Sequence, residues 1–335
     1  MRRVLALAAF GLLVLPALPA PSLAEPAPSA HPSVVEPFAL TVDAQLATGW
    51  LAYPTDAAPT TLLVFAHGCC GSLGDGNFLA GYAATYGAAA VAMSYRGNGH
   101  WNVWTGHRDT IAATEALQRR WPIQRTVIWG VSMGGEVSGM AVAARPDLYD
   151  DWVDTFGVTD LFQEFAALGL YPGIAANPGN PANPVGSWIL EETGGLPGVA
   201  PPEAWVLRSP DLRAAEMVGL QRAYIAHGVG DLIVYPTESL ATLAALQRQG
   251  IPASLCLTLT RPGPLVTHFV PGLGVPSAPT PIGLSAHDGY GFGCTGTWID
   301  QLLRGLEPDA GTLATLTVYD YNAGAGQVVQ VPSLP

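Results

Sequence analysis

The sequence contains no lysine, and few of its residues carry a charge. All 14 basic residues are arginines, against 26 acidic residues, and the formal net charge is −12. A polyanion such as nucleic acid would be repelled over most of such a surface. Only 12% of the 335 residues are charged while 49% are hydrophobic, a composition typical of a folded protein with a large apolar core. The composition therefore predicts a globular protein that does not bind nucleic acid.

Long hydrophobic runs are absent beyond the amino-terminal region. There, Arg2 and Arg3 precede an apolar stretch over residues 4–15, and residues 22–24 form a small-x-small site. This order is typical of a secretory signal peptide over residues 1–24, and its apolar part is short for a bilayer span. We expect a secreted or periplasmic protein with no stable membrane insertion after cleavage; an uncleaved amino-terminal anchor is the alternative.

Cysteine is scarce, with only Cys69, Cys70, Cys256 and Cys294 in the whole chain. Four cysteines allow three pairings, and the sequence does not choose among them. A bond between the adjacent Cys69 and Cys70 would strain the local peptide, whereas Cys256 and Cys294 could staple a loop. The alternative is four free thiols. The spacings lack the paired repeat of a zinc site, so we expect neither a metal nor a cofactor.

Residues 127–144, VIWGVSMGGEVSGMAVAA, change from a β-branched run to small, helix-compatible residues around Ser132. The spacing Gly130-Val131-Ser132-Met133-Gly134 is the G-x-S-x-G pattern of a sharp strand-to-helix turn. Its glycines let strand and helix approach closely, and the serine hydroxyl is held above the sheet. The chance occurrence of a glycine-rich turn is the alternative. The flanking strand and helix patterns favour a nucleophilic Ser132.

Strand-like and helix-like segments alternate along most of the chain. The expected strands are short and continuously apolar, as in a parallel sheet that is covered on both faces. We therefore predict an α/β fold with a mostly parallel central sheet and helices on both faces. Residues 25–37 read as a disordered lead-in and 38–335 as the domain. Within the domain, the Pro/Gly/Asn-rich region 161–222 is interpreted as a lid-like excursion and 308–335 as a β extension; an ordinary surface connection is the alternative for 161–222.

A nucleophilic serine needs a base and an acid that orients the base, and in parallel sheets such groups follow the strands. Asp231 lies just past the strand RAYIAHG and before a helix, and is the expected acid; a turn or capping role is the alternative. Asp160, which follows another predicted strand, is its rival. The expected oxyanion donors are the amides of Met133 and Cys69, because Cys69 follows the strand LLVFAHG.

The base is one of two late histidines. His287 lies in a glycine-rich loop before the last helix, and His268 lies soon after the last parallel strand. We favour His287, since the glycines allow a tight inward fold. His227, inside a strand, is expected to be a packed core residue, and His107 a surface residue at the start of a helix.

In their order along the chain, these residues resemble the α/β-hydrolase superfamily, specifically its prolyl-oligopeptidase-like branch. The matching succession is His67-Gly68, Gly130-x-Ser132-x-Gly134-Gly135, Val158-Thr159-Asp160, Ser209-Pro210, His227-Gly228-x-x-Asp231-x-x-Val234-x-Pro236 and a late histidine. The resemblance covers roughly residues 60–305. It implies the α/β-hydrolase fold, Ser132 as nucleophile, Asp231 as acid and a late histidine as base. The sequence has no room for the family's β-propeller, and an insertion separates His268 from His287.

These observations predict a secreted serine hydrolase that cleaves carboxylic esters of a small-molecule or acyl substrate through an acyl-enzyme. Esters are favoured because an alkoxide departs with less help than an amine. A serine peptidase of the aminopeptidase or oligopeptidase kind is the first alternative. A catalytically silent binding module on the same scaffold is the second, and it predicts a missing triad member.

Overall fold

The fold is seen in a computed structural model, which describes residues 31–69, 73–97, 99–170, 185–228, 231, 233–259, 292–308, 316–320 and 328–331. The expected signal peptide lies outside the described residues. The predicted disordered lead-in, residues 25–37, extends too far, because the first strand begins at Ser33. Residues 33–37 belong to that strand and pair with its neighbour, so their Pro-containing sequence is ordered by backbone hydrogen bonds.

A ten-stranded sheet crosses the part of the chain that the structure describes, in the order β1-β2-β4-β3-β5-β6-β7-β8-β9-β10. The seven strands from β4 to β9 in this order run parallel, and antiparallel strands flank them on both sides. The predicted mostly parallel sheet is confirmed. The strands are β1 (Ser33–Val42), β2 (Gln45–Pro54), β3 (Thr61–Ala66), β4 (Ala89–Met93), β5 (Arg125–Val131), β6 (Asp151–Thr155), β7 (Arg222–Gly228), β8 (Ala253–Leu259), β9 (Leu316–Asp320) and β10 (Val328–Val331).

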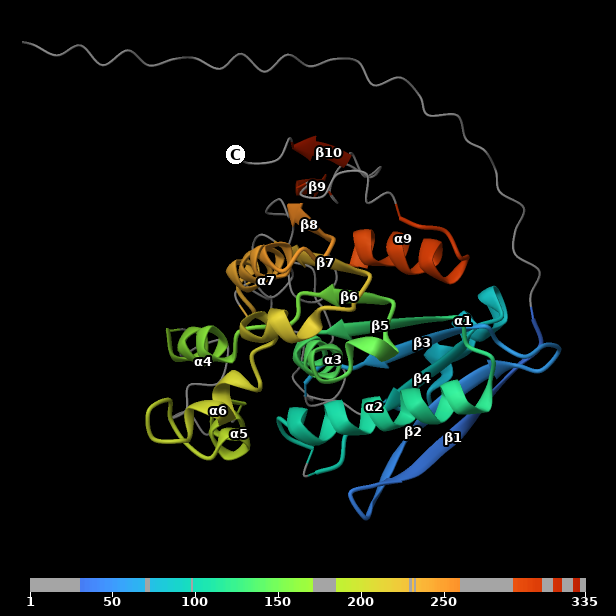
Figure 1. The fold of residues 1–335 in the computed structure, drawn as a ribbon, viewed down its shortest axis with the longest axis horizontal. Coiled ribbons are helices and arrows are strands. Elements are labelled where there is room, and N and C mark those ends of the chain that lie inside the picture. Colours follow the sequence, from blue (N-terminus) through green and yellow to red (C-terminus); the bar gives the residue numbers. More distant parts are fainter. Residues whose placement is uncertain are drawn as a thin grey trace, which may run out of the picture.

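Helices cover both faces of this sheet (Figure 1). One face is covered by α1 and α9, and the other by α2, α3 and α7. The helices are α1 (Asn77–Tyr86), α2 (Val103–Arg120), α3 (Met133–Ala144), α4 (Leu161–Leu170), α5 (Val185–Thr193), α6 (Pro202–Val206), α7 (Pro236–Arg248) and α9 (Phe292–Leu303), with 3₁₀ turns at Pro146–Leu148 and Pro210–Met217. The α/β architecture predicted from the alternating pattern is therefore confirmed.

The central strands are mostly apolar, and β4 is apolar at every position, because both faces of the sheet are covered. In β4, Val91 packs into the core on the α2 and α3 side, while Ala90 and Ala92 pack into the core on the α1 and α9 side. Successive side chains of a strand point to opposite faces, so a continuous apolar run supplies both cores. β3 does the same with Leu62 and Leu63.

The excursion between β6 and β7 folds into helices α4, α5 and α6 beside the sheet (Figure 1). It is anchored to the amino end of α2 by polar contacts. Arg208 donates to Glu192 at 3.2 Å and lies over the ring of Trp104, and Glu192 in turn accepts the Trp104 backbone N–H at 2.8 Å. Trp205 is fully buried, so it belongs to the core of this region. We call residues 161–222 the cap.

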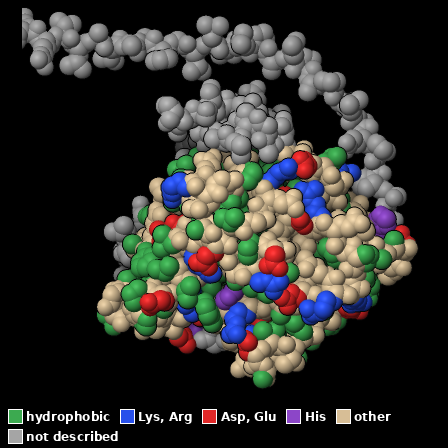
Figure 2. All heavy atoms as spheres, viewed as in Figure 1, with side chains coloured by type: hydrophobic (Ala, Val, Ile, Leu, Met, Phe, Trp, Pro, Cys, Tyr) green, Lys and Arg blue, Asp and Glu red, His purple; other side chains and the backbone are tan. Residues whose placement is uncertain are grey.

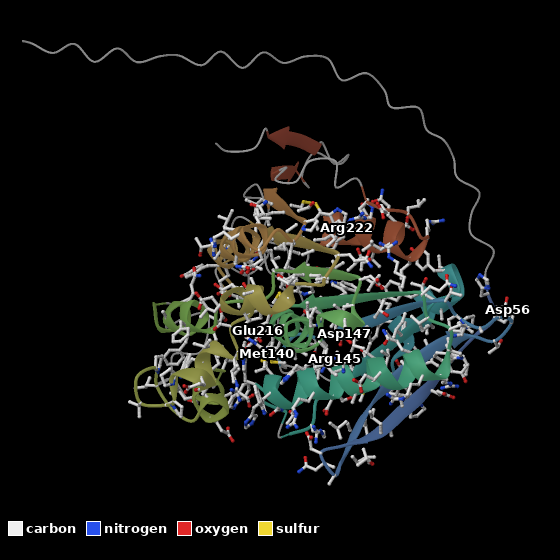
Figure 3. All side chains as sticks on the ribbon, in the orientation of Figure 1. Asp56, Met140, Arg145, Asp147, Glu216 and Arg222 are labelled. Carbon is white, nitrogen blue, oxygen red and sulfur yellow. A yellow bond between two sulfur atoms is a disulfide. The ribbon has the colours of Figure 1, made fainter. Side chains whose placement is uncertain are left out.

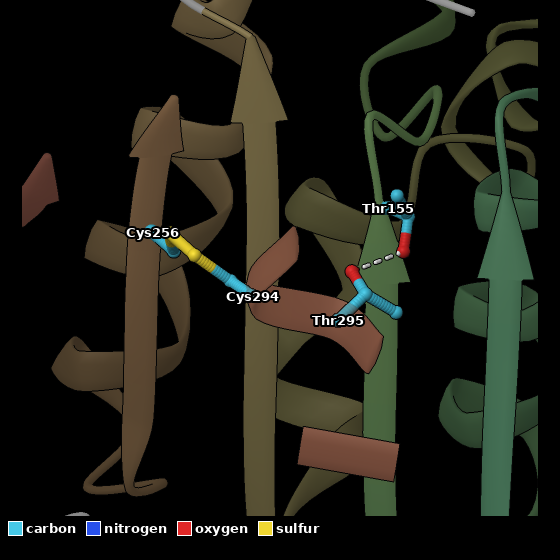
Figure 4. The surroundings of a disulfide bond; sticks show 4 residues. All are labelled: Thr155, Cys256, Cys294 and Thr295. Atoms are coloured by element: carbon cyan, nitrogen blue, oxygen red, sulfur yellow. Dashed lines mark hydrogen bonds between the residues drawn. A yellow bond between two sulfur atoms is a disulfide. The ribbon is translucent and has the colours of Figure 1, made fainter. Parts of the chain in front are cut away.

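A disulfide joins Cys256 of β8 to Cys294 of α9, across 38 residues of chain (Figure 4). The predicted staple is thereby confirmed. Close by, the hydroxyls of Thr295 and Thr155 lie 2.8 Å apart, which places the first turn of α9 beside the carboxyl end of β6. Cys69 is disulfide-bonded as well, so the alternative of four free thiols is wrong.

Arginines on the face drawn in Figure 2 lie beside acidic side chains. Arg145 pairs with Asp147 at 2.7 Å, a contact at the carboxyl end of α3 that Figure 3 labels, and Arg222 pairs with Glu307 at 2.7 Å. Such pairs neutralise the positive charges that a polyanion would contact. Within the described residues, no helix combines the length and apolar character that crossing a bilayer requires.

Candidate active site

Ser132 occupies a sharp turn between β5 and α3. Its backbone has φ 56° and ψ −126°, a conformation that residues other than glycine rarely adopt. Its residue surface is partly exposed, whereas the residues that follow it in α3 are buried. The predicted strand-to-helix turn is present, and it holds the hydroxyl at the carboxyl edge of the sheet.

The two motif glycines are required by close approach. A Cβ on Gly134 would lie 2.0 Å from the carbonyl oxygen of Ala66, and one on Gly130 would lie 2.3 Å from the carbonyl oxygen of Gly134. No side chain fits at these distances. The strand β5, the helix α3 and the loop after β3 therefore meet at backbone contact, which is what brings the loop next to Ser132.

The loop after β6 also braces the turn. The Ser132 N–H donates to the Thr155 carbonyl at 3.1 Å, and the Val158 N–H donates to the Ser132 carbonyl at 3.1 Å. Phe156 between them has a positive φ of 41°. Backbone hydrogen bonds on both sides of the serine keep the strained turn in place.

The two expected oxyanion donors come from α3 and from the loop after β3. Met133 is the first residue of α3, where backbone N–H groups have no partner within the helix. Gly68, which precedes Cys69, packs on the nucleophile: a Cβ there would lie 3.3 Å from Ser132 Cβ. Helix dipole and amides at this position favour a developing negative charge. The roles of Met133 and Cys69 stay predictions.

Asp231 follows β7 and is buried, with 1% of its surface exposed. Its Oδ1 accepts the backbone N–H groups of Ile233 at 2.8 Å and Val234 at 3.1 Å. The carboxylate thus makes the turn that the sequence offered as its alternative role. It is held rigidly at the carboxyl edge of the sheet, where β7 is separated from the β5 of Ser132 by β6 alone.

His227 is fully buried in β7, so its expected core role is confirmed. Its Nε2 lies 2.8 Å from the Val234 carbonyl and 3.3 Å from Asp231 Oδ2, and its Nδ1 lies 2.6 Å from Ser239 Oγ. Because a carbonyl only accepts, Nε2 carries the hydrogen and the Ser239 hydroxyl donates to Nδ1. His227 therefore fastens the Asp231 turn to α7.

Asp160, the rival acid, is the N-terminal capping residue of α4, the first helix of the cap. Its Oδ1 accepts the N–H groups of Phe162 at 3.0 Å and Gln163 at 3.1 Å, the pattern of an N-terminal capping aspartate. Its own N–H donates to Glu238 at 3.0 Å. The structure accounts for Asp160 by this capping role.

His107 is buried, and its expected surface position is wrong. The helix α2 begins at Val103, so His107 lies inside its second turn, and the cap covers this part of α2. Its Nδ1 lies 3.2 Å from the Val103 carbonyl, and burial lowers the pKa of its imidazole to about 4. His287 and His268 lie outside the described residues, and the choice between them stays a prediction.

Three buried carboxyls in the helices α3, α4 and α7 were not identified from the sequence. Glu136 of α3, Glu164 of α4 and Glu238 of α7 are each at most 2% exposed, and burial raises the pKa of each well above its usual value. Trp101 donates to Glu136 at 2.8 Å, and Glu238 accepts the Thr159 N–H at 2.8 Å. The one available signal was Glu136, a lone acid in an otherwise apolar helix. Among the described residues, no cluster could hold a metal ion.

Asp154 of β6 is a buried acid directly beneath the turn, and it predicts a pH-dependent stability. Its Oδ1 fills the space beside Gly157 and Gly135, and burial raises its pKa to about 8. Between about pH 5 and 7 the folded protein keeps a proton that an unfolded aspartate has lost, so stability falls as pH rises. Asp154→Asn should flatten the dependence of the unfolding free energy on pH by up to about 1.4 kcal/mol per pH unit.

Urea unfolding from pH 5 to pH 7 measures this slope. Asp147→Asn is the matched control, because Arg145 lowers the pKa of that exposed carboxyl and it is ionised in both states over this range. Equal slopes for wild type and Asp154→Asn would contradict the prediction.

Residues 87–173 match the sequence profile of the prolyl oligopeptidase family. This segment contains β4, β5 and β6 and the whole Ser132 turn. No curated protein sequence matches the chain.

Solved structures of both peptidases and esterases share the fold. The acylaminoacyl peptidase of Pyrococcus horikoshii superimposes with a TM-score of 0.52 at 17% identity, over 68% of this chain and 37% of that one. A Mycobacterium tuberculosis puromycin-hydrolyzing peptidase gives 0.53 at 20% identity, over 67% and 36%. A Pyrobaculum calidifontis esterase gives 0.53 at 15% identity, over 69% and 76%. The chain thus spans little more than a third of either peptidase and about three quarters of the esterase.

Proposed function

We propose that this chain is a secreted carboxylesterase. The premise is that it has the α/β-hydrolase fold and a segment that matches the prolyl oligopeptidase family, and that it is a serine hydrolase by class. One observation carries the proposal: a strained, partly exposed Ser132 at the carboxyl edge of a parallel sheet, with the Gly68 loop packed on it. Esterase is preferred because the chain is similar to the esterase over about three quarters of that protein's length. The positively charged, then apolar start of the sequence supports secretion.

In the proposed reaction, Ser132 Oγ attacks the carbonyl carbon of the ester while its proton passes to the imidazole of His287. Asp231 holds that imidazole and supports its positive charge. The amides of Met133 and Cys69 stabilise the tetrahedral oxyanion. The imidazolium then gives its proton to the departing alkoxide, and water hydrolyses the acyl-enzyme by the same path.

A substrate panel tests the choice between ester and peptide. We expect kcat/KM for short or long p-nitrophenyl esters to exceed that for aminoacyl and prolyl p-nitroanilides by more than about tenfold, which is 1.4 kcal/mol of transition-state stabilisation. Faster hydrolysis of the nitroanilides would instead support the peptidase alternative, which the similarity to two peptidases keeps open.

Asp231→Asn is expected to lower kcat about ten-thousand-fold, because an amide leaves the imidazole in the wrong tautomer. Steady-state ester hydrolysis measures the loss. Asp160→Asn is the control: asparagine is also a good helix cap, so turnover should change little. A reversed order of the two effects would make Asp160 the acid.

A further inference from the structure

The loop after β3 is held beside the nucleophile by a pair of stacked rings. The imidazole of His67 lies parallel to the ring of Tyr95, with ring centroids 4.0 Å apart and planes 12° apart. The Tyr95 hydroxyl donates to the His67 carbonyl at 3.1 Å. His67 is followed by Gly68, which packs on Ser132. The ring pair therefore lies one residue away from the contact with the proposed nucleophile.

Tyr95 is itself immobilised by its surroundings. It has a positive φ of 46°, and its ring packs on α2 at Gly106, where a Cβ would be 2.9 Å from Tyr95 Cγ. The next residue, Arg96, is tied to Asp109 of α2 through its backbone N–H at 3.0 Å and its Nε at 2.6 Å. A ring packed against α2 can serve as a rigid support for His67.

His67 controls the orientation of one peptide group. Its Nδ1 lies 2.8 Å from the Gly68 carbonyl oxygen, and because a carbonyl only accepts, Nδ1 carries the hydrogen. The peptide between Gly68 and Cys69 is planar and trans, so its N–H points away from its C=O. Fixing the Gly68 oxygen on the imidazole therefore fixes the direction of the Cys69 N–H.

We propose that His67 and Tyr95 are positioning residues that orient the Cys69 N–H toward the oxyanion. This inference rests on the proposed function, since it concerns the second donor of that site. It explains why the stacked His67 and Tyr95 rings lie next to Gly68, the residue through which this loop packs on Ser132. Both rings keep their hydrogen-bonding state near neutral pH, because burial lowers the pKa of His67 and raises that of Tyr95. The expected effect of variants is therefore on geometry and not on charge.

Three variants test the proposal through ester hydrolysis. His67→Leu removes the Nδ1 donor and should lower kcat by about 10- to 100-fold with KM little changed, less than the 100- to 1000-fold loss of a whole oxyanion donor. His67→Asn places an amide nitrogen where Nδ1 was and should restore most of kcat. Tyr95→Phe keeps the stacked ring but removes the hydroxyl and should give a smaller loss. Tyr149→Phe is the control, a buried tyrosine that contacts Thr114 in the core.

A boronic acid that forms a tetrahedral adduct with serine gives the second readout. The affinity of the folded His67→Leu enzyme for the boronate should fall in parallel with kcat. A merely structural role would lower the number of active sites and leave the boronate affinity of the folded fraction unchanged. Unchanged kcat in His67→Leu, no rescue by asparagine, or a rise in KM alone overturns the proposal. If His67→Leu does not fold, Tyr95→Phe against Tyr149→Phe decides. A wild type that a fluorophosphonate fails to label overturns the proposed function itself; labelling of His67→Leu at the wild-type rate overturns only the positioning role.

Discussion

Replacing Ser132 with alanine is expected to lower ester turnover about a million-fold, to a level set by binding and the oxyanion donors alone. The reason is geometric: the strained turn presents this hydroxyl at the sheet edge, and alanine has no atom to attack the carbonyl. Alanine should tolerate the positive φ no worse than serine, so the protein should remain folded. Initial rates with p-nitrophenyl esters and covalent labelling by a fluorophosphonate measure the loss.

Ser138→Ala is the matched control for this experiment. Ser138 lies in the same helix, is buried, and bonds the Gly135 carbonyl at 3.0 Å and Trp152 Nε1 at 2.9 Å. Its loss should affect stability and leave labelling intact. A folded wild type that takes up no fluorophosphonate would instead favour the silent binding module.

Replacing His287 with alanine should cost about as much as replacing Ser132, because without the base the serine keeps its proton. The position of α9 supports this choice. His287 precedes α9, whose first turn is tied to β8 by Cys294 and contacts Thr155, the residue that accepts the Ser132 N–H. The first turn of α9 therefore lies close to the Ser132 turn.

His268→Ala, assayed in parallel, is the comparison for the base. We expect it to retain most of the wild-type kcat. If His268→Ala abolishes turnover and His287→Ala does not, the base is His268. Far-ultraviolet circular dichroism of both variants separates loss of the base from loss of the fold.

The fold was predictable because the strongest signals in the sequence are local. Apolar runs of five residues, as in β4 and at the end of β5, separated by amphipathic helices, require a sheet buried on both faces. The Ser132 turn was predictable because its five-residue pattern is local, and Gly130 is demanded by contact with the adjacent α3, although Gly134 is demanded by the remote Ala66. The Cys256–Cys294 bond was one of the pairings that the sequence allowed, and the structure selected it.

The errors arose where distant segments meet. His107 was placed on the surface because nothing near it in sequence shows that the cap covers the start of α2. Residues 33–37 resemble a disordered linker, yet β2 supplies the hydrogen bonds that order them. The acids Glu136, Glu164 and Glu238 look like ordinary surface residues until α3, α4 and α7 enclose them.

By itself, the sequence determined the alternation of strands and helices, the position of the sharp turn, and the residue types available for a serine hydrolase. Those properties depend on backbone conformation and on periodicity, which neighbouring residues set. Tertiary structure alone decided which carboxyls are buried and that Tyr95 stacks on His67. Such outcomes depend on desolvation and on contacts between segments remote in the chain, and a linear pattern does not contain the distances that control them.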